Sequence, residues 1–230
     1  MIKILTLCVY ISFFHANTTH HYQVEFMGID VANVSMAYRD TVFANHLATV
    51  VEFSARTEAI SNFFYPVDNY YEIIHSIDTH QILSFRKITT QPGLNSELFT
   101  DLKDSRPYYH DSDVSIAKDT ITIFTLFYLM AHDLLGVEKF TIEREGLNYE
   151  ASLLKLSNEL NFQKYMLNLR INSSPDKMSI LQQTDIFTWA VFKKNAARSI
   201  WVNTSEKPIE KCIFDLGLIN LTAKYLFTDE

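Results

Sequence analysis

Glycine, proline and cysteine are all scarce in this chain of 230 residues, which contains five, five and two of them respectively. Linkers and disordered segments are usually rich in glycine and proline, so this scarcity argues against long regions of either kind. Two cysteines cannot build the disulfide framework of a small secreted scaffold, and a chain of this length can bury a sufficient core without one. The composition therefore predicts one or two ordinary globular domains.

Familiar catalytic and ligand-binding motifs are also missing. The sequence has no glycine-rich phosphate loop, no Gly-x-Ser-x-Gly nucleophile motif, no His-Glu-x-x-His pair and no Cys-x-x-Cys pair. Each of these chemistries needs a spacing that places its groups around one centre. The chain is therefore predicted not to be an enzyme, and we expect neither a cofactor nor a metal.

Positive charge is in deficit, because 20 Lys and Arg residues face 27 Asp and Glu residues, for a net charge of -7. Proteins that bind nucleic acid generally carry a basic stripe or patch. We therefore expect no nucleic-acid partner.

The N-terminal segment differs from the rest of the chain. Lys3 precedes an apolar run over residues 4–14, and the small residue Ala16 follows it. A positive start, a short apolar run and a small residue are typical of a secretory signal, and the run is shorter than the roughly 20 residues that span a bilayer. We expect residues 1–16 to be a signal peptide and residues 17–230 to be a single β-rich domain. The mature protein would not span a membrane and would be periplasmic or otherwise exported within a bacterial envelope. A buried N-terminal strand is the alternative interpretation.

Strict alternation of apolar and polar residues dominates the remainder, for example over residues 51–56 and 164–171. Such alternation is typical of a sheet with one face on a core and the other nearer to water. Gly146 is expected to take a positive φ in a tight hairpin, and Glu143 and Glu145 beside it are interpreted as surface charge. Further strands are predicted over residues 31–38, 70–76, 83–90, 138–145, 149–157, 187–192, 199–202, 209–214 and 218–227.

Two segments break the alternation. Residues 59–65 are compatible with one or two helical turns ended by Pro66. Residues 119–135 are predicted to form a longer helix, with Asp119 as its N-cap and Gly136 at its end. Apolar residues cover most of its circumference, so we expect it to be buried against the concave side of a curved sheet.

Aromatic residues are abundant, with 17 Phe and 12 Tyr. Core packing accounts for most of them, but a curved sheet with aromatic surface to spare can also line a ligand cavity. The candidate ligand-binding residues cluster around Pro66 or lie on two strands predicted to be adjacent. They are Tyr65, Tyr70, Tyr71, Trp189 and Trp201.

Several short segments distributed along the chain form a recognisable set: Gly28–Ala32, Glu52–Thr57, Phe64–Asp68, Tyr71–Glu72, Asp119–Met130, Ala197–Val202, Lys207–Ile209 and Gly217. Together they resemble the bacterial domain-of-unknown-function family 3108 over nearly the whole mature chain. That resemblance implies an exported, β-rich protein, and it implies no activity, because none is established for the family.

The sequence therefore predicts a mainly β fold, a single curved antiparallel sheet (a half-barrel or open roll) wrapped around one buried helix. In outline this resembles periplasmic lipoprotein carriers, an analogy at the level of the fold. One hypothesis is an envelope protein that binds a lipid or other hydrophobic molecule, which requires an apolar cavity above about 300 Å³. The alternative is a structural or protein-interaction module of the envelope with a filled core and no ligand, whose partner would be another envelope protein. A hydrolase would instead require His and carboxylate groups that converge in a cleft.

Overall fold

The computed structural model describes residues 18–159, 161–172, 179–205 and 208–229. The predicted signal peptide, residues 1–16, lies outside the described residues. Within the described residues the chain forms three helices, α1 (Ala59–Phe64), α2 (Ile123–Ala131) and α3 (Ile186–Phe192). It also forms fourteen strands: β1 (Thr18–Phe26), β2 (Ile29–Phe43), β3 (His46–Thr57), β4 (Asp68–Ser76), β5 (Ile82–Gln91), β6 (Leu94–Lys103), β7 (Arg106–Tyr109), β8 (Thr120–Ile121), β9 (Lys139–Arg144), β10 (Leu147–Glu159), β11 (Phe162–Ile171), β12 (Ala197–Asn203), β13 (Ile209–Asp215) and β14 (Asn220–Asp229).

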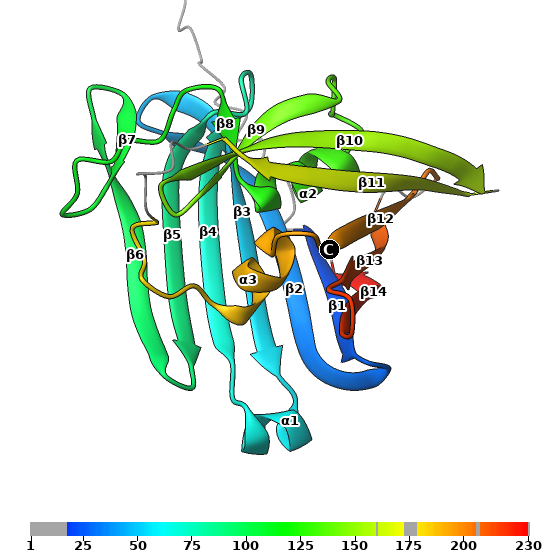
Figure 1. Cartoon of the computed structure of the whole chain (residues 1–230). Helices are drawn as coiled ribbons and strands as arrows, with labels where there is room; N and C mark the ends of the chain where they lie inside the picture. The colour runs from blue at the N-terminus through cyan, green and yellow to red at the C-terminus, as the bar shows by residue number, and fades with distance from the viewer. Residues whose placement is uncertain (1–17, 160, 173–178, 206–207, 230) are drawn as a thin grey trace, which may run out of the picture.

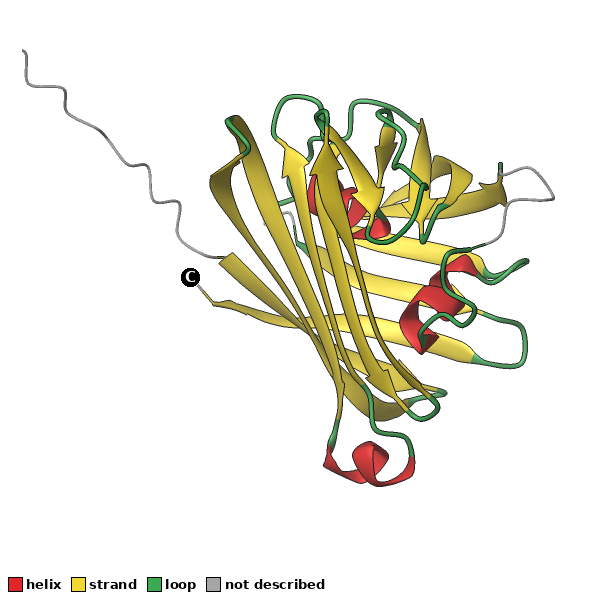
Figure 2. Ribbon diagram, turned by 90° about the vertical axis from the view of Figure 1, so that its left-hand side faces the viewer, coloured by secondary structure: helices red, strands yellow, loops and turns green. Residues whose placement is uncertain are grey.

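The strands form one sheet in the order β7-β6-β5-β4-β3-β2-β1-β14-β13-β12-β11-β10-β9-β8. The first and last strands of the chain, β1 and β14, pair in the middle of this order, and β7 and β8 are its two edges. Neighbouring strands are antiparallel except for the short parallel pair β8 and β9. The sheet curves strongly without closing, with α2 and α3 on its concave side (Figures 1 and 2). This confirms the predicted fold.

Tight turns set the register of the hairpins. Asp104 and Ser105 join β6 to β7, and Glu145 and Gly146 join β9 to β10, with positive φ at both residues of each turn. Two-residue hairpin turns need that conformation because it matches the twist of the strands. The positive φ favours glycine at position 146, as predicted, and a Cβ there would also approach the side chain of Ile180 to 3.0 Å, which would have to shift.

Helix α2 fills the concave side of the sheet, as predicted, but its bounds differ from the prediction. Thr122, not Asp119, is the N-cap, and its Oγ1 accepts a hydrogen bond of 3.0 Å from the Thr125 amide. The preceding residues, Thr120 and Ile121, form β8 instead, because their backbone pairs with β9. The helix ends at Ala131, so Gly136 lies beyond its C-terminus. Eight of its nine residues are buried, which explains the nearly continuous apolar surface seen in the sequence.

Some elements were missed or misassigned from the sequence. The segment predicted as a strand over residues 187–192 is helix α3, because Asp185 caps it by accepting a hydrogen bond of 2.9 Å from the Thr188 amide. Helix α1 occupies the predicted position before Pro66. Strands β1, β6 and β7 had no counterpart in the prediction. None of the helices in the described residues is long and apolar enough to cross a membrane.

Candidate functional site

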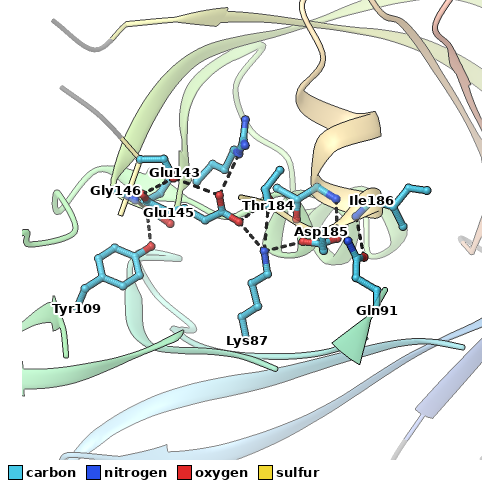
Figure 3. Close-up of polar contacts among 12 residues, drawn as sticks. Lys87, Gln91, Tyr109, Glu143, Glu145, Gly146, Thr184, Asp185 and Ile186 are labelled. Atoms are coloured by element: carbon cyan, nitrogen blue, oxygen red, sulfur yellow. Dashed lines mark hydrogen bonds and ion pairs between the residues drawn. The ribbon is translucent and has the colours of Figure 1, made fainter. Parts of the chain in front are cut away.

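Buried polar side chains join the two ends of the curved sheet. Tyr109 on β7 donates a hydrogen bond of 2.5 Å to Glu143 on β9. Lys87 on β5 lies 2.5 Å from a carboxylate oxygen of Glu145, in the β9–β10 turn, and 2.5 Å from one of Asp185, the N-cap of α3 (Figure 3). We call these five residues the seam cluster, because they connect strands that lie far apart in the order of the sheet.

Burial controls the electrostatics of the seam cluster. Burial alone would raise the pKa of Asp185, but the Lys87 ammonium and the hydrogen bonds to the carboxylate hold that pKa below its ordinary value. Burial also raises the pKa of Tyr109 well above its ordinary value, and the neighbouring Glu143 charge raises it further. The phenol therefore stays protonated and donates a hydrogen bond to the Glu143 carboxylate.

The seam cluster has little access to any substrate. Lys87 and Glu145 are 1% and 2% exposed, and the cavity beside them is only about 20 Å³. A buried ion pair of this kind holds elements together, because removing one partner leaves the other charge without compensation. Among the described residues, no group of three or more His, Cys, Asp or Glu side chains is arranged to hold a metal.

One sequence-based interpretation needs correction here. Glu143 and Glu145 are buried, not surface charges, because the end of β9 and the turn that follows it pack inward against the seam. The Arg198 guanidinium donates hydrogen bonds to the carbonyl of Val191 in the last turn of α3 and to those of Lys193 and Ala196 after the helix.

A second feature is an apolar cavity of about 460 Å³ between the strands in the middle of the sheet and the helices α1 and α3. We call it the apolar cavity. Its walls come from β1, β2, β3, β4 and β14, from α1 and the residues after it, and from α3. A smaller space of about 80 Å³ adjoins it and shares Val24, Val34, Phe187 and Leu221 as walls.

The apolar cavity runs from an exposed rim to a buried floor. Phe64 and Ile186 at the rim are 78% and 39% exposed. Val34 and Ala55 on the floor are buried. Asn69, also on the floor, is 0% exposed and has no hydrogen-bond partner for either side-chain atom among the described residues. A large apolar recess with a few polar groups is the usual form of a small-molecule site.

The structure separates the five candidate aromatic residues. Tyr65 lies at the rim of the apolar cavity. Tyr71 is buried beside the seam cluster, and Tyr70, on the opposite face of β4, donates a hydrogen bond of 3.1 Å to Glu52. Trp189 on α3 stacks under Lys193, and Trp201 on β12 lies between the ammonium groups of Lys164 and Lys211. A ligand-binding role for these five residues stays a prediction.

The polar residues of the seam cluster and of the apolar cavity were not identified from the sequence, although the alternation pattern of β4 and β5 contains a sign of them. Lys87 and Thr89 share the inward phase of β5 with Phe85, and Asn69 shares that of β4 with Tyr71. A polar residue in phase with buried apolar neighbours is unusual, because burial of an unpaired polar group costs free energy. That phase is therefore the pattern that would have identified them.

Comparison with known proteins adds information about the fold. No family model and no curated protein matches the chain, so membership of family 3108 is not confirmed. Among solved structures, the chain is similar to a β-barrel-like protein of the domain of unknown function DUF1849 from Brucella abortus. The TM-score is 0.51 at 10% sequence identity, over 93% of this chain and 97% of that one. At such low identity the likeness shows the fold alone: this chain resembles a bacterial β-rich domain of unknown function.

Proposed function

We propose that this chain is an exported binding protein of the bacterial envelope that holds a lipid or other hydrophobic molecule in its unclosed sheet. The observation that carries the proposal is the apolar cavity of about 460 Å³. That volume exceeds the roughly 300 Å³ expected at the lower end for a small-molecule site. Export rests on the signal-like pattern of residues 1–16.

The arrangement of the apolar cavity supports binding rather than catalysis. Phe64 and Tyr65 at the rim leave the recess open to an incoming molecule, and the floor is buried and mostly aliphatic. Transfer of apolar surface from water into such a recess is favourable by about 25 cal/mol per Å². The acidic groups of the seam cluster lie outside the lining of this cavity.

The alternative of a structural module with a filled core fits less well. That hypothesis predicts an interior without a cavity, whereas the apolar cavity and the adjoining space of about 80 Å³ together form a substantial void. A filled core would leave no such space, because protein interiors are packed nearly as densely as organic crystals.

Filling the apolar cavity is expected to weaken binding of an apolar probe. Ala55 lies on its floor, where β3 pairs with Val34 on one side and Asn69 on the other. Ala55→Trp places an indole in the recess, and we expect the affinity for 1-N-phenylnaphthylamine to fall by about tenfold or more. Titration of the purified protein with the probe, followed by its fluorescence, measures this change.

Ala37→Trp is the matched control. Ala37 lies on β2, close to Ala55 in the sheet, but outside the lining of the apolar cavity. The control should bind the probe as the wild type does. Equal affinity in Ala55→Trp and Ala37→Trp would contradict the proposed site, and no binding by the wild type would contradict the proposed function.

A further inference from the structure

Asn69 is an anomaly on the floor of the apolar cavity. Its side chain is fully buried, yet neither Nδ2 nor Oδ1 has a hydrogen-bond partner among the described residues. Most buried polar side-chain atoms in proteins are paired, and an unpaired one therefore needs an explanation. A primary carboxamide offers a donor and an acceptor side by side, so a suitable partner must supply one of each.

A second unpaired group lies beside Asn69. Thr89 on β5 is the direct cross-strand neighbour of Asn69 on β4, and its buried Oγ1 also lacks a partner among the described residues. Direct cross-strand neighbours project from the same face of a sheet. Unpaired hydrogen-bonding capacity is therefore concentrated at this pair, of which Asn69 is the member that lines the apolar cavity.

The described lining of the apolar cavity around Asn69 is uncharged. Among the described residues that line the apolar cavity, none carries a charged side chain. Arg56 and Asp68 are neighbours of cavity residues in the chain, but both are exposed and pair with each other. The inward-facing Lys87 is already held between Glu145 and Asp185. An anionic head group buried beside Asn69 would lack a cation, and that uncompensated charge would cost several kcal/mol.

We propose that the ligand of the apolar cavity is an uncharged amphiphile whose head carries both a hydrogen-bond donor and an acceptor, such as a primary amide or a hydroxyl. The Asn69 side chain is closed to solvent in the empty cavity, so binding turns its carboxamide toward the cavity, where it pairs with the head. The apolar chain extends toward the rim at Phe64 and Tyr65. This inference rests on the proposed function, because it names the ligand class of the same site.

Competition experiments test the pairing. Octane, octanamide and octanoate are each titrated against bound 1-N-phenylnaphthylamine on wild-type protein and on Asn69→Leu, which keeps the side-chain size. We expect the variant to bind octanamide about tenfold more weakly, because two neutral hydrogen bonds are lost, and to bind octane as the wild type does. Octanoate should bind the wild type more weakly than octanamide does. Asn95→Leu, an exposed substitution on β6, is the matched control and should change nothing.

The outcomes separate this inference from the proposed function. If octane fails to displace the probe from the wild type, the proposed function itself fails. If octane displaces the probe but Asn69→Leu leaves octanamide affinity unchanged, or weakens both ligands equally, the pairing with Asn69 is wrong. A test without substitution follows the side-chain amide resonance of Asn69 by NMR. Octanamide should shift that resonance and octane should not, whereas equal shifts would overturn the inference.

Discussion

Replacing Lys87 by methionine is expected to lower the free energy of unfolding by about 3–5 kcal/mol at neutral pH, as is typical when one partner of a buried ion pair is removed. Lys87 is 1% exposed and lies 2.5 Å from carboxylate oxygens of both Glu145 and Asp185. Methionine preserves most of the length of the side chain but leaves two buried carboxylates without their ammonium group. Urea denaturation of the two proteins measures the difference.

Arg86→Met is the matched control, one residue earlier on the same strand. Arg86 pairs with Glu97 at 2.8 Å, but both side chains are about half exposed. An exposed pair contributes about 1 kcal/mol or less. The triple variant that also carries Glu145→Gln and Asp185→Asn should recover part of the loss, because no buried charge then remains unpaired. A Lys87→Met protein that is as stable as Arg86→Met would show that the seam cluster does not hold the sheet ends together.

The seam cluster is also connected to the wall of the apolar cavity, through helix α3. Asp185 caps this helix, and the next two residues, Ile186 and Phe187, form part of the cavity wall. The Ile186 amide in turn donates a hydrogen bond of 3.1 Å to the Gln91 side chain on β5. Loss of the cluster would therefore loosen a wall of the cavity as well as the junction of the sheet ends.

Acidification from pH 6.5 to about 4 is expected to destabilise the protein through His75. This side chain is fully buried on β4, and burial lowers its pKa to about 4. The neighbouring His80 also lowers that pKa, whereas the Ser76 carbonyl and Asp40 oppose the shift. In this pH window the unfolded chain binds a proton at His75 that the folded protein does not, so stability decreases as the pH falls. A shift of this size corresponds to about 3 kcal/mol.

Urea denaturation at a series of pH values measures the effect. His75→Gln removes the titrating group and should flatten the dependence of stability on pH between pH 4 and 6.5. His20, whose pKa is also lowered to about 4, contributes a residual dependence of the same sign. His46→Gln, an exposed substitution next to the β2–β3 turn, is the control. If His75→Gln keeps the full wild-type slope, His75 is not the group that carries this dependence.

Much of the fold could be predicted because local patterns encode it. Alternation with period two places Val51 and Phe53 on the inner face of β3, and Gly146 marks a hairpin turn that the backbone requires. The buried helix α2 was predictable from its apolar circumference. Helix α3 was not, because its sequence, Ile-Phe-Thr-Trp-Ala-Val-Phe, consists largely of β-branched and aromatic residues. Its capping residue Asp185 and its packing outweigh that local preference for strand.

The site could not be predicted to the same degree, because it depends on contacts between distant parts of the chain. Lys87 meets Glu145 across 58 residues, and Tyr109 meets Glu143 across 34. Strand alternation places these side chains inward but does not indicate which strand they will face. Asn69 is similar, since its missing partner becomes apparent only when β3, β4 and β5 are paired.

The most direct test of the central claim is mass spectrometry of organic extracts from the protein purified gently from the cells that naturally make it. We expect the wild type to yield a stoichiometric amount of one class of uncharged hydrophobic or amphiphilic molecule, and Ala55→Trp, made in the same cells, to yield at most a small fraction of that amount. A wild-type extract that contains nothing beyond that of Ala55→Trp would contradict the account, because the apolar cavity would then have no natural ligand.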